Sequence, residues 1–312
     1  MKTVIERTIT RRDTLKLLAG AGIAAGLGQA FAASAPGAIL KRPIPKTGEM
    51  LPALGLGTYR AFDVGSTADE RASVREVLEL FAQMGGTVVD SSPMYGNAEE
   101  VVGDLAAELG IAELLFMATK VWTTGRDAGM RQMQASMRKM RSNPMELMQI
   151  HNLVDWRTHI DTLRQWKEEG RIRYLGVTHY TTGSYNELEQ LIKTQNLDFV
   201  QFNFSIATRE AEKRLLPLAA LHQVATIINR PFEQGRLFRA TKGKPLPGFA
   251  TEFDCHSWAQ FFLKYVLSSP GVTCPIPATS NPKHLVDNMQ AGFGLLPDKS
   301  TRRKMVEVIQ QL

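Results

Sequence analysis

The chain has 312 residues, of which 44% are hydrophobic, and a formal net charge of +6. This length is sufficient for one large α/β core and requires no second domain. The basic excess is small, and no basic stripe is interleaved with aromatic residues, so nucleic-acid binding is not expected. Two cysteines, Cys255 and Cys274, are too few for a disulfide scaffold. Whether they are bridged stays open, with two free thiols favoured.

The N-terminal segment is typical of an export signal. Thr10–Lys16 contains twin arginines, Leu17–Phe31 is a weakly apolar run, and Ala30-Phe31-Ala32 is an A-x-A cleavage site. The run is shorter and less apolar than the roughly 18–20 residues that a membrane span needs, which disfavours a stable anchor. We therefore predict a twin-arginine signal over 1–32, recognised by the twin-arginine export machinery, and a periplasmic or otherwise exported mature chain over 33–312. Its removal lowers the formal charge from +6 to +3, because the segment holds five basic and two acidic residues.

A hairpin is expected directly after the signal. Ile39–Pro43 and Met50–Leu54 flank the polar turn Lys46–Glu49, and such a hairpin is suited to plugging the bottom of a barrel.

Strand and helix patterns then alternate along the rest of the chain. The expected strands lie at Ala53–Leu56, Thr87–Asp90, Leu114–Lys120, Leu147–His151, Tyr174–Thr178, Phe199–Phe204, Ala225–Asn229 and Val272–Pro277. The expected helices lie at Ala72–Met84, Glu99–Leu109, Met130–Met140, Trp156–Glu169, Tyr185–Lys193, Arg209–His222, Ser257–Leu267 and Pro282–Met289. This alternation predicts the α/β class and a single (β/α)8 TIM barrel. An open doubly wound sheet is the alternative, but Gly55–Arg60 lacks the G-x-G-x-x-G loop typical of it.

Two segments fall outside the repeating pattern. Glu233–His256 is the longest stretch without periodicity, and we expect an unstructured loop there that acts as a lid or a disordered insertion. Asp298–Leu312 predicts a last amphipathic, C-terminal helix.

Four titratable residues follow three successive predicted strands: Asp90 and Tyr95, then Lys120, then His151. The carboxyl ends of barrel strands meet at one rim, so these side chains are expected to converge. A lysine ammonium beside a tyrosine would lower the tyrosine pKa from about 10, and Asp90 would compensate the buried lysine. His151 can form a hydrogen bond to a substrate oxygen. The four residues together are then suited to act as a general acid toward a carbonyl oxygen. Singly, each residue is explained as well by a turn, a rim aromatic, a surface lysine or a strand-end histidine.

These motifs resemble those of the aldo-keto reductase superfamily over essentially the whole mature chain. The resemblance implies Tyr95 as the general acid, Lys120 and Asp90 as the pair that tunes it, and His151 as the residue that orients substrate. It rests on segments similar to the first-strand, catalytic, lysine and histidine motifs of the family: Leu54–Tyr59, Asp90–Glu99, Thr119-Lys120 and Gln149–His151.

The resemblance also implies a nicotinamide cofactor. Gln201 matches the glutamine that holds the nicotinamide amide, and Thr178-His179 occupies the place of the family's Ser-Asn. Asn229 aligns with the aromatic residue that normally stacks on the nicotinamide, a role for which Phe232 or Phe204 is a substitute. The full set of cofactor-binding residues implied in this way is Thr58, Thr178, His179, Gln201, Asn229, Pro231, Gly235, Thr279, Ser280, Lys283, His284 and Asn288.

Ile276–Asn288 resembles the segment of the family that binds the cofactor phosphate. In this chain Ala278 and His284 replace the lysine and arginine that meet the 2′-phosphate of NADP. Thr279 and Ser280, with the start of the following helix, are suited to phosphate oxygens, and Lys283 is a compensating cation. We expect NADP(H) in preference to NAD(H), and the two missing cations leave that choice open.

The predicted function is NAD(P)-dependent reduction, or formation, of a carbonyl in an aldehyde, ketone or sugar. Tyr59, Trp122 and Phe204 are the candidate substrate contacts, and no metal site is expected. Because an exported protein cannot rely on a soluble nicotinamide pool, we expect a tightly held cofactor covered by Glu233–His256. Two alternatives stay open: a redox-neutral isomerase or dismutase with bound cofactor, and a dinucleotide-binding sensor or partner barrel with little turnover.

Overall fold

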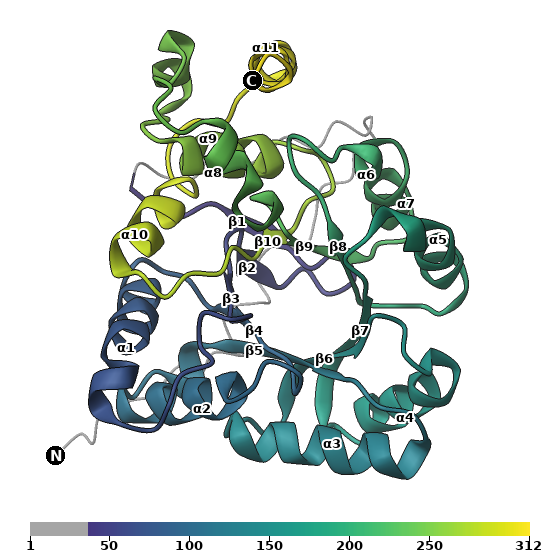
Figure 1. Ribbon diagram of the computed structural model, residues 1–312. Helices are drawn as coiled ribbons and strands as arrows, with labels where there is room; N and C mark the ends of the chain where they lie inside the picture. The colour runs from purple at the N-terminus through teal and green to yellow at the C-terminus, as the bar shows by residue number, and fades with distance from the viewer. Residues whose placement is uncertain (1–36) are drawn as a thin grey trace, which may run out of the picture. The chain divides into compact units, whose positions relative to one another are not determined.

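The computed structural model describes residues 37–312, so the expected signal over 1–32 lies outside them. Eight parallel strands follow one another around a ring (Figure 1) in the order β3 to β10. Their bounds are β3 Leu56–Gly57, β4 Val88–Asp90, β5 Phe116–Val121, β6 Met145–His151, β7 Ile172–Thr178, β8 Phe199–Asn203, β9 Ala225–Asn229 and β10 Cys274–Pro275. The predicted single TIM barrel is therefore confirmed.

Backbone hydrogen bonds between the first and last strands close the ring. The amides of Gly55 and Gly57 donate to the carbonyls of Pro275 and Pro277 over 3.0 and 3.1 Å. Gly57 is required for this approach, because a Cβ atom there would lie 2.7 Å from the carbonyl oxygen of Ile276. The glycines of the first-strand motif thus allow the two shortest strands to meet.

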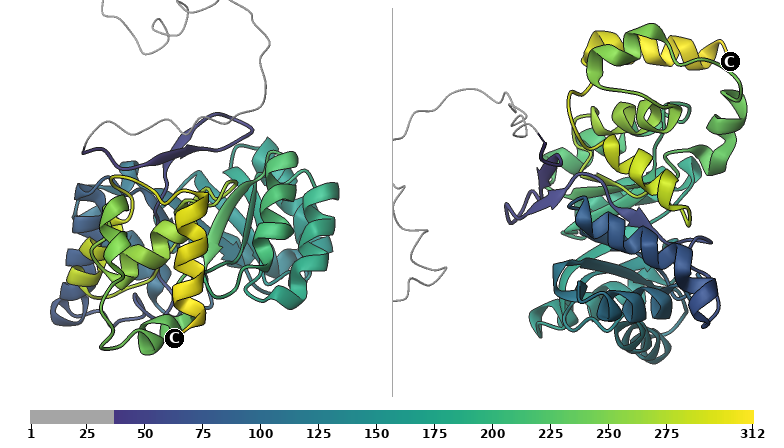
Figure 2. Two further views of the ribbon diagram at one scale, coloured as in Figure 1. Left: turned by 90° about the horizontal axis from the view of Figure 1, so that it is seen from above. Right: turned by 90° about the vertical axis from the view of Figure 1, so that its left-hand side faces the viewer.

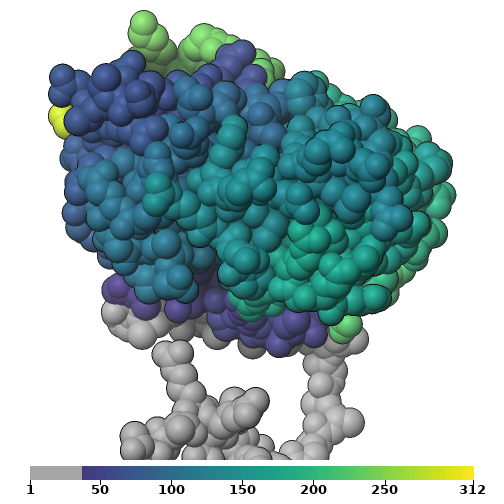
Figure 3. Space-filling model, turned by 90° about the horizontal axis from the view of Figure 1, so that it is seen from below, coloured from purple at the N-terminus to yellow at the C-terminus, as the bar shows by residue number. Residues whose placement is uncertain are grey.

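Helices surround the ring, and Figure 3 shows one side of this layer, where the residues of α1 to α4 form a continuous surface. The longer helices are α1 Ala68–Gln83, α2 Ala98–Glu108, α3 Arg126–Lys139, α4 Trp156–Glu168, α5 Tyr185–Thr194, α9 Trp258–Leu267, α10 Pro282–Gln290 and α11 Lys299–Gln310. The shorter helices α6, α7 and α8 are described below. In α1 a capping box of Thr67 and Glu70 starts the helix, and Val74, Val77 and Phe81 form its buried stripe. The predicted C-terminal helix is confirmed as α11.

One predicted helix is divided in two. The pattern over Arg209–His222 predicts a single element, whereas the structure has α6 Glu210–Lys213 and α7 Leu215–Leu221. Arg214 separates them with φ −125° and ψ −80°, outside the helical region. A hydrophobic pattern does not reveal such a break, because both pieces bury the same side.

The predicted hairpin is present at one end of the barrel. It consists of β1 Lys41–Pro43 and β2 Met50–Pro52, which pair antiparallel. Ile44 and Leu51 are buried in the same cluster as the inward-facing residues of the barrel strands. Figure 2 shows the hairpin at one end and the segment after β9 at the other. The hairpin therefore fills the end opposite the expected site.

Glu233–His256 is not the unstructured loop expected from the sequence. It contains η4 Glu233–Gly235, α8 Arg236–Ala240 and η5 Gly248–Phe253. Its Phe253 is buried against Phe261 of α9, with ring centroids 6.3 Å apart. Elements of three to six residues are too short to produce a periodic pattern, and single apolar anchors order the segment instead.

Two further features concern cysteines and membranes. Cys255 and Cys274 are both free and buried, as favoured from the sequence. Within residues 37–312, no helix combines the length and the apolar character needed to cross a bilayer.

Candidate active site

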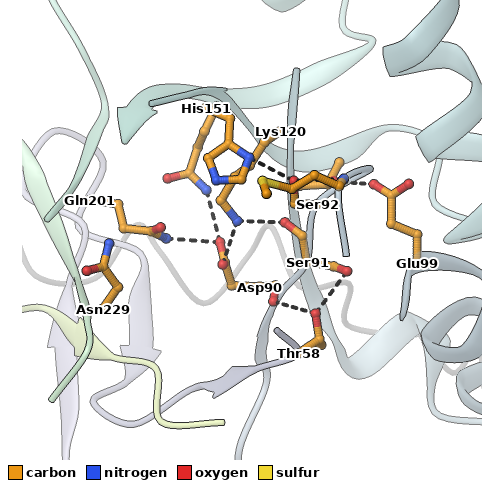
Figure 4. Close-up of polar contacts among 12 residues, drawn as sticks. Thr58, Asp90, Ser91, Ser92, Glu99, Lys120, His151, Gln201 and Asn229 are labelled. Atoms are coloured by element: carbon orange, nitrogen blue, oxygen red, sulfur yellow. Dashed lines mark hydrogen bonds and ion pairs between the residues drawn. The ribbon is translucent and has the colours of Figure 1, made fainter. Parts of the chain in front are cut away.

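The four expected catalytic residues come together at the carboxyl end of the barrel. Asp90 and His151 are the last residues of β4 and β6, and Lys120 is the last but one residue of β5. Tyr95 lies in the turn between β4 and α2, where its ring is 5.3 Å from Lys120 Nζ and 5.8 Å from the His151 ring. Asp90, Lys120 and His151 point toward one another in Figure 4.

A buried ion pair lies at the centre of the site. Lys120 Nζ is 2.6 Å from Asp90 Oδ2 and also donates to the Ser91 carbonyl over 2.6 Å. Asp90 Oδ1 accepts hydrogen bonds from Gln149 Nε2 at 3.1 Å and Gln201 Nε2 at 3.0 Å. Every oxygen of this carboxylate is therefore paired, which is the condition under which a buried ion pair is tolerated. Burial lowers the pKa of Lys120, and the charge of Asp90 opposes that shift.

Two of these partners make contacts that the sequence did not reveal. Gln201, expected on the nicotinamide amide, donates its own amide nitrogen to Asp90, which leaves its carbonyl oxygen for another donor. Gln149 was not among the expected site residues. Its only sequence signal was its place two residues before His151, which puts both side chains on the inner face of β6.

The pKa of Tyr95 is shifted opposite to the expected direction. Burial, then the charge of Asp90, raise the pKa of Tyr95, whereas the sequence argument predicted that Lys120 would lower it. The prediction was wrong because Lys120 is already neutralised by Asp90 at 2.6 Å and faces the ring of Tyr95. At neutral pH the hydroxyl of Tyr95 is consequently protonated, which is the form that donates a proton.

His151 is a neutral imidazole with an ordered tautomer. Burial, then the charge of Lys120, lower the pKa of His151 to about 2. Its Nδ1 is 2.8 Å from Ser92 Oγ, which in turn accepts the Met94 amide at 3.4 Å. The Ser92 hydroxyl has one hydrogen and two lone pairs, so this contact is compatible with either tautomer of the ring. We assign the hydroxyl as the donor to Nδ1, which places the ring proton on Nε2 and makes Nε2 a donor.

Ser92 and Glu99 contact the candidate residues or their neighbours, and the sequence did not single them out. Ser92 lies in a segment that is equally typical of a turn. Glu99, in α2, is buried and accepts hydrogen bonds from Thr119 Oγ1 and Ser136 Oγ. Burial raises the pKa of Glu99. Glu99 lies at the right of Figure 4, apart from the Lys120–Asp90 pair. Its partner Thr119 directly precedes Lys120 in β5.

The expected substrate contacts divide into two kinds. Tyr59 and Trp122 are each 42% exposed at the rim. The Tyr59 ring lies 5.0 Å from Tyr95, and the Trp122 ring lies 6.3 Å from His151. Phe204 is instead fully buried and packs on Tyr265 of α9, so it belongs to the core, and neither substrate contact nor nicotinamide stacking is open to it.

The residues expected to hold the nicotinamide lie after β7 and β9. The amide of Asn229 donates to the His179 carbonyl over 3.1 Å and joins the two strand ends. His179 Nδ1 accepts the backbone amides of Tyr180 and Thr181, so its Nε2 carries the proton and is a donor. Thr178 and Pro231 are buried beside them, and Gly235 starts α8 with φ +83°. Thr58 is buried and bonds to the Asp90 carbonyl, which places its hydroxyl beneath the site.

A nicotinamide fits the donor and acceptor pattern of this region. The side-chain oxygens of Gln149, Asn203 and Asn229 are buried and have no hydrogen-bond partner within the described residues. Buried amide oxygens are normally paired, so these acceptors indicate a place for a donor that the protein does not supply. A carboxamide group carries such donors.

The expected phosphate-binding residues lie at the start of α10. Thr279 Oγ1 accepts the Asn281 amide at 3.0 Å, and Asn281 Oδ1 caps the helix through the Lys283 amide at 2.9 Å. The Ser280 carbonyl accepts a bond from Ser73 of α1. Lys283 and His284 are exposed and form no ion pair in residues 37–312, and Asn288 is buried on the helix.

Comparisons with known proteins agree with this architecture. A methylglyoxal reductase of Escherichia coli (strain K12), YeaE, is 27% identical over 245 residues, 76% of this chain and 84% of the relative. An NADH-specific methylglyoxal reductase of the same strain is 26% identical over 242 residues, 67% of this chain and 72% of the relative. A crystal structure of an aldo/keto reductase from Klebsiella pneumoniae, in complex with NADP and acetate, has the same fold. Its TM-score is 0.72 at 24% identity, covering 84% of this chain and 93% of the other.

The profile of the aldo/keto reductase family matches residues 53–304, which include every barrel strand. The chain therefore belongs to the aldo/keto reductase family and is an oxidoreductase of that family.

Proposed function

We propose that the protein reduces the carbonyl of an aldehyde, ketone or sugar with NAD(P)H and catalyses the reverse oxidation. The observation that carries this proposal is the protonated Tyr95 hydroxyl beside the neutral His151, above the Lys120–Asp90 pair. The dinucleotide, when bound, supplies the hydride. The remaining chemistry is the transfer of one proton to the carbonyl oxygen, for which this rim has the groups.

The proton transfer follows from the positions of three side chains. The substrate oxygen accepts hydrogen bonds from the Tyr95 hydroxyl and from His151 Nε2, which fix its place. Tyr95 gives its proton to this oxygen as negative charge develops there. The tyrosinate that remains lies beside the Lys120–Asp90 pair, with Lys120 Nζ 5.3 Å from the ring centroid. The raised pKa of Tyr95 then favours its reprotonation from solvent.

Substitution of Tyr95 tests this assignment. In Tyr95→Phe the proton donor is lost while the ring packing is kept, and we expect carbonyl reduction to fall by about 10²–10⁴-fold with dinucleotide affinity unchanged. Tyr174→Phe is the matched control, since it removes a tyrosine hydroxyl that donates to Glu49 at the hairpin end of the barrel, and it should retain most activity. Wild-type turnover in Tyr95→Phe would exclude Tyr95 as the acid. Conversion of substrate without net change in NAD(P)H would favour the isomerase or dismutase alternative.

For the cofactor we propose NADP(H) in preference to NAD(H). The Klebsiella structure contains NADP. Lys283 and His284 are exposed, and their side chains have no hydrogen-bond or ion-pair partner among residues 37–312. The expected nicotinamide contacts are Gln201, Thr178 and His179. Titration of the purified protein with both dinucleotides measures the preference directly, and tighter binding of NADH would overturn it.

We also propose export through the twin-arginine pathway with the cofactor already bound. Support comes from the sequence of residues 1–32 and from the rim segment Glu233–His256, which lies at the end of the barrel opposite the hairpin. Replacement of Arg11 and Arg12 by lysine should retain the protein in the cytoplasm, as measured by cell fractionation. Mature protein purified from the periplasm should release a dinucleotide on denaturation. Protein free of dinucleotide would contradict the tightly held cofactor.

A further inference from the structure

Arg230 is a cation at the mouth of the site that the proposed reaction does not use. It follows the last residue of β9, and its guanidinium carbon lies 4.1 Å from the centroid of the Tyr180 ring, in the loop after β7. The side chain is partly buried. Within residues 37–312 it forms no ion pair and donates no hydrogen bond, although a guanidinium has five N–H donors.

The backbone holds Arg230 in this position. Its φ is +53°, a left-handed conformation that residues with a side chain rarely adopt, and Pro231 follows it. Asn229 bonds to the His179 carbonyl and fixes the end of β9 against the end of β7. Such a strained residue at the rim of a site is a reason to look for a role.

Arg230 lies at the carboxyl rim of the barrel, the same end that holds the proposed reaction centre. It directly follows Asn229, whose side chain bonds to the His179 carbonyl, and it stacks on Tyr180. Its positive charge opposes the rise that burial causes in the pKa of Tyr95. The rim thus holds a guanidinium that has no ion-pair partner among residues 37–312.

We propose that Arg230 binds a carboxylate on the substrate, so that the protein acts preferentially on aldehydes and ketones that carry an acid group. A planar guanidinium matches a carboxylate through two parallel hydrogen bonds. The stacking on Tyr180 leaves the edge of the guanidinium for that contact. The proposal rests on the proposed reduction and adds the class of substrate to it. In the reaction the aldehyde carbon gains a hydride from NAD(P)H and its oxygen gains the proton of Tyr95, while the carboxylate is unchanged.

The anionic oxygens that Arg230 meets have a second source, the pyrophosphate of the dinucleotide. We assign the substrate because Arg230 stacks on Tyr180 and follows Asn229, which bonds to the His179 carbonyl, whereas the expected phosphate contacts Thr279 and Ser280 follow β10. The experiment below separates the two sources.

The test compares each acid with its own neutral ester. Succinic semialdehyde and para-carboxybenzaldehyde are assayed beside their methyl esters, with wild type and Arg230→Gln. We expect wild type to prefer the acids and Arg230→Gln to raise KM for the acids about 10–100-fold, the range for a hydrogen-bonded charge pair. The esters should change less than about twofold, and Arg230→Lys should recover part of the loss because it keeps the charge.

Two control variants and a binding assay complete the test. Arg171→Gln removes an arginine stacked on Trp166 at the opposite end of the barrel and should change neither substrate class. Arg60→Gln removes the exposed arginine over Tyr59, and loss of acid preference there instead of at Arg230 would overturn the assignment. Quenching of tryptophan fluorescence measures dinucleotide affinity without turnover.

The outcomes have distinct meanings. Weaker dinucleotide binding in Arg230→Gln, with acids and esters affected equally, would place the pyrophosphate on Arg230 and overturn the proposal. Wild type that reduces esters as well as acids would also overturn it, while the proposed carbonyl reduction would stand. Reduction of neither class by wild type would contradict the proposed function itself.

Discussion

At the ends of β4 to β6 the two buried charges are paired, whereas a cation at the end of β9 has no ion pair in the described residues. Asp90 accepts hydrogen bonds at both carboxylate oxygens, and Lys120 donates to Asp90 and to the Ser91 carbonyl. Amide oxygens without partners lie in both halves, at Gln149 in β6 and at Asn203 and Asn229 in β8 and β9, and the unpaired cation is Arg230. The charge pair of the first half is therefore formed before any ligand binds, and the second half has a charged group available for a ligand.

The comparison predicts that substitutions in the first half affect both folding and catalysis. Lys120→Met leaves the Asp90 carboxylate buried and uncompensated, which should reduce the free energy of unfolding by about 3–5 kcal/mol. We expect carbonyl reduction to fall at least about 10²-fold, measured by steady-state kinetics beside urea denaturation.

A double variant separates the two effects of Lys120. Lys120→Met with Asp90→Asn removes both charges, so much of the stability should return while activity stays low. Recovery of activity together with stability would show that the Lys120–Asp90 pair acts only in folding. It would contradict the prediction that the first half of the rim also contributes to catalysis.

His151 gives a pH signature of the first half. Its folded-state pKa of about 2 lies below the usual 6.5, so the folded protein binds fewer protons than the unfolded chain between these values. Stability from this group is full above pH 6.5 and is lost as pH falls, by about 2 kcal/mol at pH 5. His151→Gln should therefore lose less stability than wild type between pH 7 and pH 5 in denaturant titrations. Equal losses would mean that the imidazole titrates freely.

The smallest effect is expected at an exposed residue of the second half. Lys283→Ala should leave the free energy of unfolding within about 0.5 kcal/mol of wild type, because the side chain has no partner within the part of the chain that the structure describes. NADP affinity should fall by about 3–10-fold with NAD affinity unchanged, as expected for a partly solvated ion pair. Lys299→Ala, on α11, is the matched control for loss of one exposed lysine. A large loss of unfolding free energy in Lys283→Ala would contradict the expectation that this residue of the second half contributes to ligand binding and not to folding.

Much of the site could be predicted, because the type of each residue and its position at the end of a strand were enough to place its side chain at the rim. The alternation of patterns predicted the barrel, and parallel strands bring their carboxyl ends to one rim, so Asp90, Lys120 and His151 had to converge. Gln149 and Ser92 were missed because their roles depend on partners far along the chain. Gln149 meets Asp90 across 59 residues, and Gln201 meets the same carboxylate across 111.

The sequence by itself determined the order of elements, the barrel class and the candidate residues for proton transfer, since these follow from periodicity and local chemistry. Only the tertiary structure decided the direction of the Tyr95 pKa shift, the burial of Phe204, the ordering of Glu233–His256 and the lack of an ion pair at Arg230 among residues 37–312. Each of these depends on desolvation or on distant partners. Local patterns do not specify such quantities, because they are set by how the strands and loops pack around the same rim.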